Sequence, residues 1–150
     1  MNREWQYKGL KPRIIVEPLI ATPKMLREYK FFCFNGEPKF YQTCYDRNNA
    51  LGGAILNFYD LEGRKMDLQD ASHSRHSEVE MPRPINLQKM IDFSKSLSSD
   101  TIFLRVDFFE VEEQLFVGEL TLEEGGGFCE FTPNQWNEIL GCWIKLPIDK

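Results

Sequence analysis

Short runs of aromatic and β-branched residues, separated by turn residues, constrain the fold of this chain more than any other feature. The runs occupy residues 14–20, 29–35, 39–45, 54–59, 102–111 and 115–122. Aromatic residues make up 13% of the chain, including 12 Phe, and this composition favours a sheet. We expect a helix over residues 87–98, with Asn86 as its N-cap and with an apolar stripe at helical spacing made of Leu87, Met90, Ile91, Ser94 and Leu97. A short helix is expected over 134–140. We therefore predict an α+β fold, mainly an antiparallel sheet with one or two packed helices.

Length and charge limit what the chain can do. Its 150 residues suit one domain spanning residues 1–150, in which residues 61–85 form a long polar loop. His73 and His76 lie in this loop, and we do not expect them to bind a metal. The net charge of −5 argues against nucleic-acid binding. Apolar runs are too short for a membrane span, and four cysteines without metal-ligand spacing suggest free thiols and a cytoplasmic location.

Two strands carry charged residues on one face. Arg105 and Asp107 alternate with apolar neighbours, and Glu119 and Thr121 do the same on the next strand. Because 107 and 119 have equal parity, antiparallel pairing across a three-residue loop or a bulge would place Asp107 beside Glu119 and Arg105 beside Thr121. Such a carboxylate pair suits Mg²⁺ bound to phosphate. The alternative is a solvated polar face of an amphipathic hairpin.

Four separated motifs resemble one family when they are read in order. They are Lys11-Pro-Arg-Ile-Ile-Val-Glu17, Tyr29-Lys-Phe-Phe-Cys-Phe-Asn-Gly36, Phe58-Tyr-Asp60 and Arg105-Val-Asp-Phe-Phe109, followed by Gly118-Glu-Leu-Thr121 and a glycine-rich turn. Together they resemble the TupA-like ATP-grasp family, which is associated with bacterial polysaccharide and teichuronopeptide biosynthesis. The resemblance spans most of residues 5–146 and implies the C-terminal half of an ATP-grasp unit, without an N-terminal substrate domain or a glycine-rich lid.

The resemblance implies a site for ATP and Mg²⁺. Glu17, Pro18 and Leu19 would lie against adenine, and Glu28 would accept from the ribose hydroxyls. The metal ligands would be Asp107 and Glu119, with Thr121 at a position where many family members have Asn. The residue that contacts phosphate is left open among three candidates, Lys30, Arg64 and Lys65. Arg105 would lie near the transferred phosphoryl group and, with Lys30, would be a catalytic residue.

The implied reaction is ligation of a carboxylate to an amine through an acyl phosphate, with a polysaccharide or peptide acceptor. Two alternatives remain. One is a non-catalytic truncated or split remnant that acts with an N-terminal partner chain, and the other is a glycosyltransferase of a polysaccharide pathway.

Overall fold

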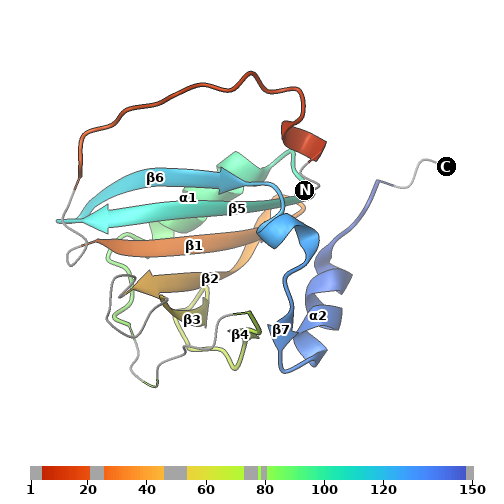
Figure 1. Cartoon of the computed structure of the whole chain (residues 1–150). Coiled ribbons are helices and arrows are strands. Elements are labelled where there is room, and N and C mark those ends of the chain that lie inside the picture. The colour runs from red at the N-terminus through yellow and green to blue at the C-terminus, as the bar shows by residue number, and fades with distance from the viewer. Residues whose placement is uncertain (1–4, 21–25, 46–53, 73–77, 79–80, 148–150) are drawn as a thin grey trace.

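A computed structural model describes residues 5–20, 26–45, 54–72, 78 and 81–147. Its centre is a five-stranded antiparallel sheet with the order β3-β2-β1-β5-β6 (Figure 1). The strands are β1 (Arg27–Phe34), β2 (Glu37–Tyr45), β3 (Ile55–Asp60), β5 (Phe103–Val111) and β6 (Gln114–Thr121). The predicted α+β class is confirmed, and five of the six predicted strands lie within two residues of their expected bounds.

The sixth predicted strand, over residues 14–20, is wrong. These residues follow a 3-10 helix, η1 (Trp5–Tyr7), and run as an extended segment that stands off from the sheet (Figure 1). A strand requires backbone partners, and no described strand pairs with this segment. Its β-branched side chains are therefore left in solvent.

One face of the sheet packs against the helix α1 (Leu87–Ser98), whose predicted bounds are confirmed. Leu87, Met90 and Ser94 form its buried side, whereas Leu97, which was predicted on the apolar stripe, is exposed. The opposing sheet residues are mainly aromatic or branched and include Tyr29, Phe31, Tyr41, Val106 and Phe108. Figure 1 shows α1 behind the sheet, so this layer buries the face that the alternation of β1 and β5 makes apolar.

The other face is covered along only part of its length. The second helix, α2 (Gln135–Trp143), lies there with a small two-stranded sheet of β4 (Gln69–Asp70) and β7 (Phe131–Thr132). These elements bury a cluster of rings on the sheet, namely Phe32, Phe34, Phe40 and Phe58. Trp136 and Trp143 pack against the same cluster. Beside the rings, the same face carries charged side chains.

Turn chemistry fixes the two hairpins that build this sheet. Asn35 and Gly36 join β1 to β2 with φ of 49° and 80°, as the Asn-Gly pair predicts. Glu112 and Glu113 join β5 to β6 with φ of 49° and 66°. Positive φ is unusual for glutamate, so this second turn has no comparable sequence signal.

The start of α1 differs from the prediction. Asn86 precedes the helix as expected, but its side chain does not cap it. Its Nδ2 instead donates to Glu110 Oε1 at 3.0 Å and to the carbonyl of Glu113 at 2.8 Å. The helix is thus tied to the end of β5 rather than capped locally.

The predicted polar loop 61–85 contains β4 and an isolated bridge between Lys65 and Tyr59, so it is partly ordered by pairing. The four cysteines form no disulfide among the described residues; Cys33 and Cys44 are buried, Cys129 is partly buried and Cys142 is exposed. None of the helices in the described part of the chain has the length and apolar character needed to cross a membrane.

Candidate functional site

A row of polar residues crosses three adjacent strands on the partly covered face. Lys30 of β1 is the register partner of Asp107 of β5, and Asp107 is the partner of Glu119 of β6. Directly opposite residues of antiparallel strands project from the same face, so the three side chains converge. The predicted pairing of Asp107 with Glu119, and of Arg105 with Thr121, is confirmed.

Gly118 sets this pairing. Val117 is opposite Phe108 and Glu119 is opposite Asp107, so Gly118 is an extra residue that forms a bulge in β6. In a regular ladder Gly118 would face Asp107, and Glu119 would project from the other face. A side chain does not fit at the bulge, because a Cβ at residue 118 would lie 2.4 Å from the ring of Phe109.

Arg105 links the acidic residues of this face. Its Nε and one terminal nitrogen donate to the two oxygens of Asp107 at 2.7 and 2.8 Å. The same terminal nitrogen reaches Glu119 at 3.2 Å, and the other contacts Glu124 of η2 (Glu124–Gly127). Burial opposes the charged guanidinium, but the hydrogen bond to Asp107 and the negative charges of Glu124 and Asp107 outweigh it and raise the pKa of Arg105.

Lys30 provides a second cation beside the same carboxylate. Its Nζ contacts Asp107 and lies 3.0 Å from Glu28. The Asp107 side chain is 1% exposed and lies between Lys30 and Arg105, whereas the Glu119 side chain is 63% exposed. Asp107 is therefore fixed by two cations, while Glu119 remains accessible to a ligand.

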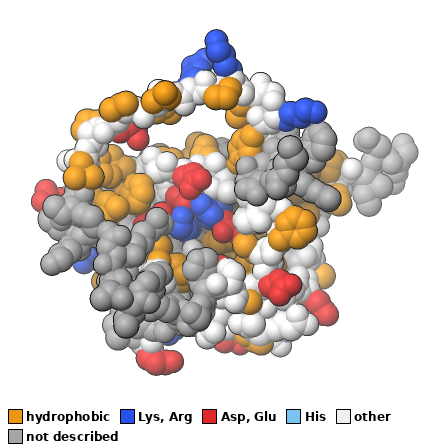
Figure 2. All heavy atoms as spheres, in the orientation of Figure 1, with side chains coloured by type: hydrophobic (Ala, Val, Ile, Leu, Met, Phe, Trp, Pro, Cys, Tyr) orange, Lys and Arg blue, Asp and Glu red, His pale blue; other side chains and the backbone are white. Residues whose placement is uncertain are grey.

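We call Glu28, Lys30, Arg105, Asp107, Glu119 and Glu124 the charged cluster. It contains four carboxylates and two cations, so its formal charge is −2. In Figure 2, acidic and basic side chains gather in the middle of the face that carries it. An excess of negative charge favours a divalent cation and disfavours a bare phosphate chain.

Two carboxylates of the cluster are suitable ligands for Mg²⁺. This ion typically binds one or two protein carboxylates and completes its coordination sphere with water and phosphate oxygens. Asp107 and Glu119 are such a pair. Thr121 adds a buried hydroxyl without a hydrogen-bond partner among the described residues, beside Arg105. No group of three or more His, Cys, Asp or Glu side chains in the described part of the chain can hold a metal alone. The residues thus fit a metal that arrives with phosphate oxygens.

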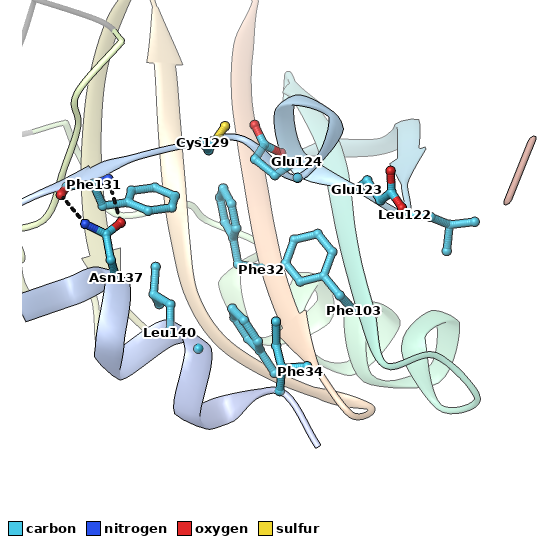
Figure 3. Close-up of a pocket in the computed structure, with 13 residues that line it drawn as sticks. Phe32, Phe34, Phe103, Leu122, Glu123, Glu124, Cys129, Phe131, Asn137 and Leu140 are labelled. Atoms are coloured by element: carbon cyan, nitrogen blue, oxygen red, sulfur yellow. Dashed lines mark hydrogen bonds between the residues drawn. The ribbon is translucent and has the colours of Figure 1, made fainter. Parts of the chain in front are cut away.

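Two hollows flank the cluster. The smaller has a volume of about 280 Å³, and basic, acidic and uncharged residues line it, namely Lys30, Gln42, Cys44, Ala54, Leu56, Asp70, Arg105 and Glu124. The larger, of about 400 Å³, is mainly apolar and lies between the sheet and the segment that leads into α2. Figure 3 shows Phe32, Phe34 and Phe103 on its sheet side and Phe131 and Leu140 opposite them. Glu124 lines both hollows, so an apolar pocket adjoins the charged cluster.

The structure does not bring every predicted site residue to this place. Glu17, Pro18 and Leu19 belong to the exposed segment and line neither hollow. The expected meeting of Glu17 and Glu28 at one cleft depends on the absent strand over residues 14–20, and the structure does not show it.

The basic candidates for phosphate binding separate clearly. Lys30 lies in the charged cluster. Arg64 is exposed and forms ion pairs with Asp60 at 2.6 Å and Glu62 at 3.0 Å. The backbone of Lys65 forms an isolated β-bridge with that of Tyr59. Neither Arg64 nor Lys65 lines the hollows. His73 and His76 lie outside the described residues.

Sequence reasoning missed Glu124, Gln42 and Asp70. Glu124 stands just beyond the end of β6, where strand alternation no longer predicts a direction. Gln42 lies opposite Lys30 only because β1 and β2 shift register between Phe32 and Cys33. Asp70 reaches the hollow from the long loop, and its position gives no periodic signal.

A model of one protein family, described as TupA-like ATPgrasp, matches residues 1–145. The match covers nearly the whole chain and includes all of the charged cluster. No curated protein and no solved structure matches the chain significantly.

Proposed function

The chain belongs to the TupA-like ATP-grasp family, and from this we propose that its charged cluster binds the phosphates of ATP together with Mg²⁺. The observation that carries the proposal is the row formed by Lys30, Asp107 and Glu119, with Arg105 beside it. Two cations, the buried carboxylate of Asp107 and the accessible carboxylate of Glu119 lie on one sheet face and provide the groups that a metal-bound polyphosphate requires.

Each residue of the row has a distinct part in this proposal. Asp107 and Glu119 would hold Mg²⁺, and the Thr121 hydroxyl would hold one of its waters. The bound metal would supply positive charge that neutralises the phosphate oxygens. Lys30 is the basic candidate that its position favours for phosphate contact, because it lines the smaller hollow, whereas Arg64 and Lys65 line neither hollow.

We further propose that the reaction is ligation of a carboxylate to an amine. A carboxylate oxygen attacks the γ-phosphorus while the bond to the leaving ADP oxygen breaks. The amine then attacks the acyl carbon, and phosphate leaves as the amide forms. Arg105 is held rigidly by Asp107 and Glu124, and its remaining donor capacity would offset negative charge on the transferred group.

The apolar hollow beside the cluster supports a substrate with an apolar part near its reacting end, because Glu124 lines both places. Family context favours a carboxylate-bearing sugar or a peptide of a bacterial surface polymer as the acceptor. The proposal does not use Glu17, Pro18 or Leu19 for adenine, since the strand that would position them is absent.

Calorimetric titration of the chain with ATP tests the proposal. A cluster of formal charge −2 repels bare ATP, so we expect binding only with Mg²⁺, with a Kd of about 100 µM or weaker because Glu119 is open to solvent. Glu119→Gln should abolish the Mg²⁺-dependent part. Glu138→Gln, which removes another exposed carboxylate, on α2, should leave it unchanged.

The proposal would be contradicted if the heat of ATP binding were the same with and without Mg²⁺. It would also be contradicted if wild type and Glu119→Gln gave the same heat in the presence of Mg²⁺. Binding of a uridine diphosphate sugar in place of ATP would favour the glycosyltransferase alternative. Release of ADP that depends on both a carboxylate-bearing sugar and an amino acid would support ligation. Binding of Mg-ATP without such release under any pairing would favour the non-catalytic alternative.

A further inference from the structure

The segment of residues 10–20 exposes more apolar surface than a free chain segment of a folded protein normally does. Ile14 is 96% exposed, Val16 is 89% exposed and Leu19 is 84% exposed. Figure 2 shows the segment as an arc of largely hydrophobic side chains that stands off from the body of the molecule. Its exposure leaves the apolar groups hydrated although their sequence is typical of a buried strand.

Side chains on both sides of the segment are apolar. Ile14 and Val16 project to one side of an extended backbone and Ile15 to the other, and all three are exposed. A strand with two apolar sides is stable when another strand pairs with its backbone and its faces are covered. No described strand of this chain does so.

We propose that the partner is a second copy of this chain, paired antiparallel through residues 12–18 around a two-fold axis at Ile15. In this register Ile15 faces Ile15 of the other copy, and Ile14 faces Val16 twice. Arg13 then faces Glu17 at both ends. Every cross-strand pair from 13 to 17 therefore joins apolar with apolar or positive with negative.

The prolines agree with the same register. Pro12 faces Pro18, three residues from the axis. In an antiparallel ladder, directly opposite pairs alternate between hydrogen-bonded and non-hydrogen-bonded pairs. If the Ile15 pair is a hydrogen-bonded one, the Pro12–Pro18 pair three residues away is a non-hydrogen-bonded one. Its backbone nitrogens then point away from the partner, so the missing N–H groups cost the ladder nothing. The prolines also end the pairing on both sides.

A neighbouring register is less favourable. With the axis at Ile14, Lys11 would face Glu17, but Arg13 would face Ile15 at both ends. A charge opposite a β-branched side chain lacks the cross-strand attraction of the Arg13–Glu17 pair. Arg13 and Lys11 therefore distinguish the two registers experimentally.

Charge reversal tests the pairing in the full 150-residue chain. A two-stranded ribbon is marginal by itself, so we expect a dimer with a Kd of roughly 10–100 µM in analytical ultracentrifugation. Arg13→Glu and Glu17→Arg should each weaken it by about tenfold or more, because each makes two like-charge pairs. An equimolar mixture of the two variants should restore dimers, since both cross-strand pairs become opposite again. Lys11→Glu is the control and should change little.

A proline pair tests the backbone register. Ile15→Pro removes an N–H that the ladder uses and should abolish the dimer, whereas Val16→Pro removes an outward-pointing N–H and should retain most of it. Circular dichroism of the dilute monomers should be unchanged by these substitutions, because the side chains project into solvent in the single chain. A chain that stays monomeric at about 500 µM would overturn the proposal. The proposal would also be overturned if neither charge reversal weakened the dimer or if the mixture of the two variants failed to dimerise. A greater loss of dimer affinity from Lys11→Glu than from Arg13→Glu would overturn it as well.

Discussion

Glu119 lies directly opposite Asp107 only because Gly118 is an unpaired residue between two regular stretches of the β5–β6 ladder. The two-residue turn at Glu112 and Glu113 alone would pair Asp107 with Gly118. The bulge therefore turns Glu119 onto the face that holds Lys30 and Arg105. A single backbone irregularity thus assembles the proposed metal ligands.

Gly118→Ala should destabilise the chain by about 1–3 kcal/mol, the usual cost of forcing extra volume into a packed place. The new methyl group would overlap the Phe109 ring, which lies 2.4 Å from a Cβ at this position. Urea unfolding measures the loss. In a Phe109→Ala background the same substitution should cost much less, because the overlapping ring is gone. Equal costs in both backgrounds would show that the ring is not the reason for glycine.

Asp107→Asn should lower the free energy of unfolding by about 3–5 kcal/mol, the range for removing one partner of a buried ion pair. The change leaves Lys30 and Arg105 without the carboxylate that neutralises both. Glu119→Gln should cost under about 1 kcal/mol, because that side chain is 63% exposed. Carboxylates at an open cleft would contribute little to the stability of the fold. Burial of Asp107 overturns this for one of the two.

Chemical denaturation of the two variants, each with wild type beside it, checks the contrast. If Asp107→Asn unfolds at the same urea concentration as wild type, Asp107 is not the counter-ion that the geometry indicates. Since Asp107→Asn is expected to weaken the fold, Glu119→Gln is the better variant for measuring ligand binding.

Local patterns were sufficient for most of the sheet and for α1. Alternation in residues 102–111, the Asn35-Gly36 turn and the helical spacing after Asn86 each report a short-range preference that the structure keeps. The same reasoning failed for residues 14–20, because β propensity states that a segment suits a strand but not that a partner is present.

The site was harder to foresee for a different reason. The alternation of side chains along the two strands predicted that Asp107 lies beside Glu119. The contact of Asp107 with Lys30 instead depends on the pairing of β5 with β1, in which these two residues are 77 positions apart in the sequence. No local pattern reports such a distant pairing. The same holds for Glu124, which reaches Arg105 from the glycine-rich turn.

Glu110→Gln should destabilise the chain by about 1–2 kcal/mol. Glu110 Oε1 accepts from the backbone N–H of Asn86 at 2.8 Å and from its side chain, and Oε2 accepts from Ile85 at 3.3 Å. A glutamine has one acceptor oxygen in place of two, so one of these donors loses its partner. Thermal unfolding measures the effect. Glu112→Gln, two residues away in an exposed turn, is the matched control and should leave the melting temperature within about 1 °C of wild type.

Stability should decline in alkaline solution because two thiols resist ionisation in the fold. Burial is the main cause that raises the pKa of Cys33 from 9.0 to about 11, and burial together with the charge of Glu124 raises that of Cys129 from 9.0 to about 11. Below pH 9 both states hold these protons and the thiols add no pH dependence. Between pH 9 and 11 the unfolded chain releases protons that the folded chain keeps, so unfolding becomes easier as pH rises.

Each such thiol steepens the decline by up to about 1.4 kcal/mol per pH unit in this window. Urea unfolding from pH 8 to 10.5 under a reducing agent measures the slope, and Cys33→Ala should flatten it even if the variant is less stable at every pH. Cys142→Ala, which removes an exposed thiol, is the matched control. The slope, rather than the absolute stability, isolates the proton, because a cavity left by the smaller side chain costs the same free energy at pH 8 and pH 10. An unchanged slope in Cys33→Ala would mean that the Cys33 thiol ionises equally in the folded and unfolded states, contrary to its burial beneath α1.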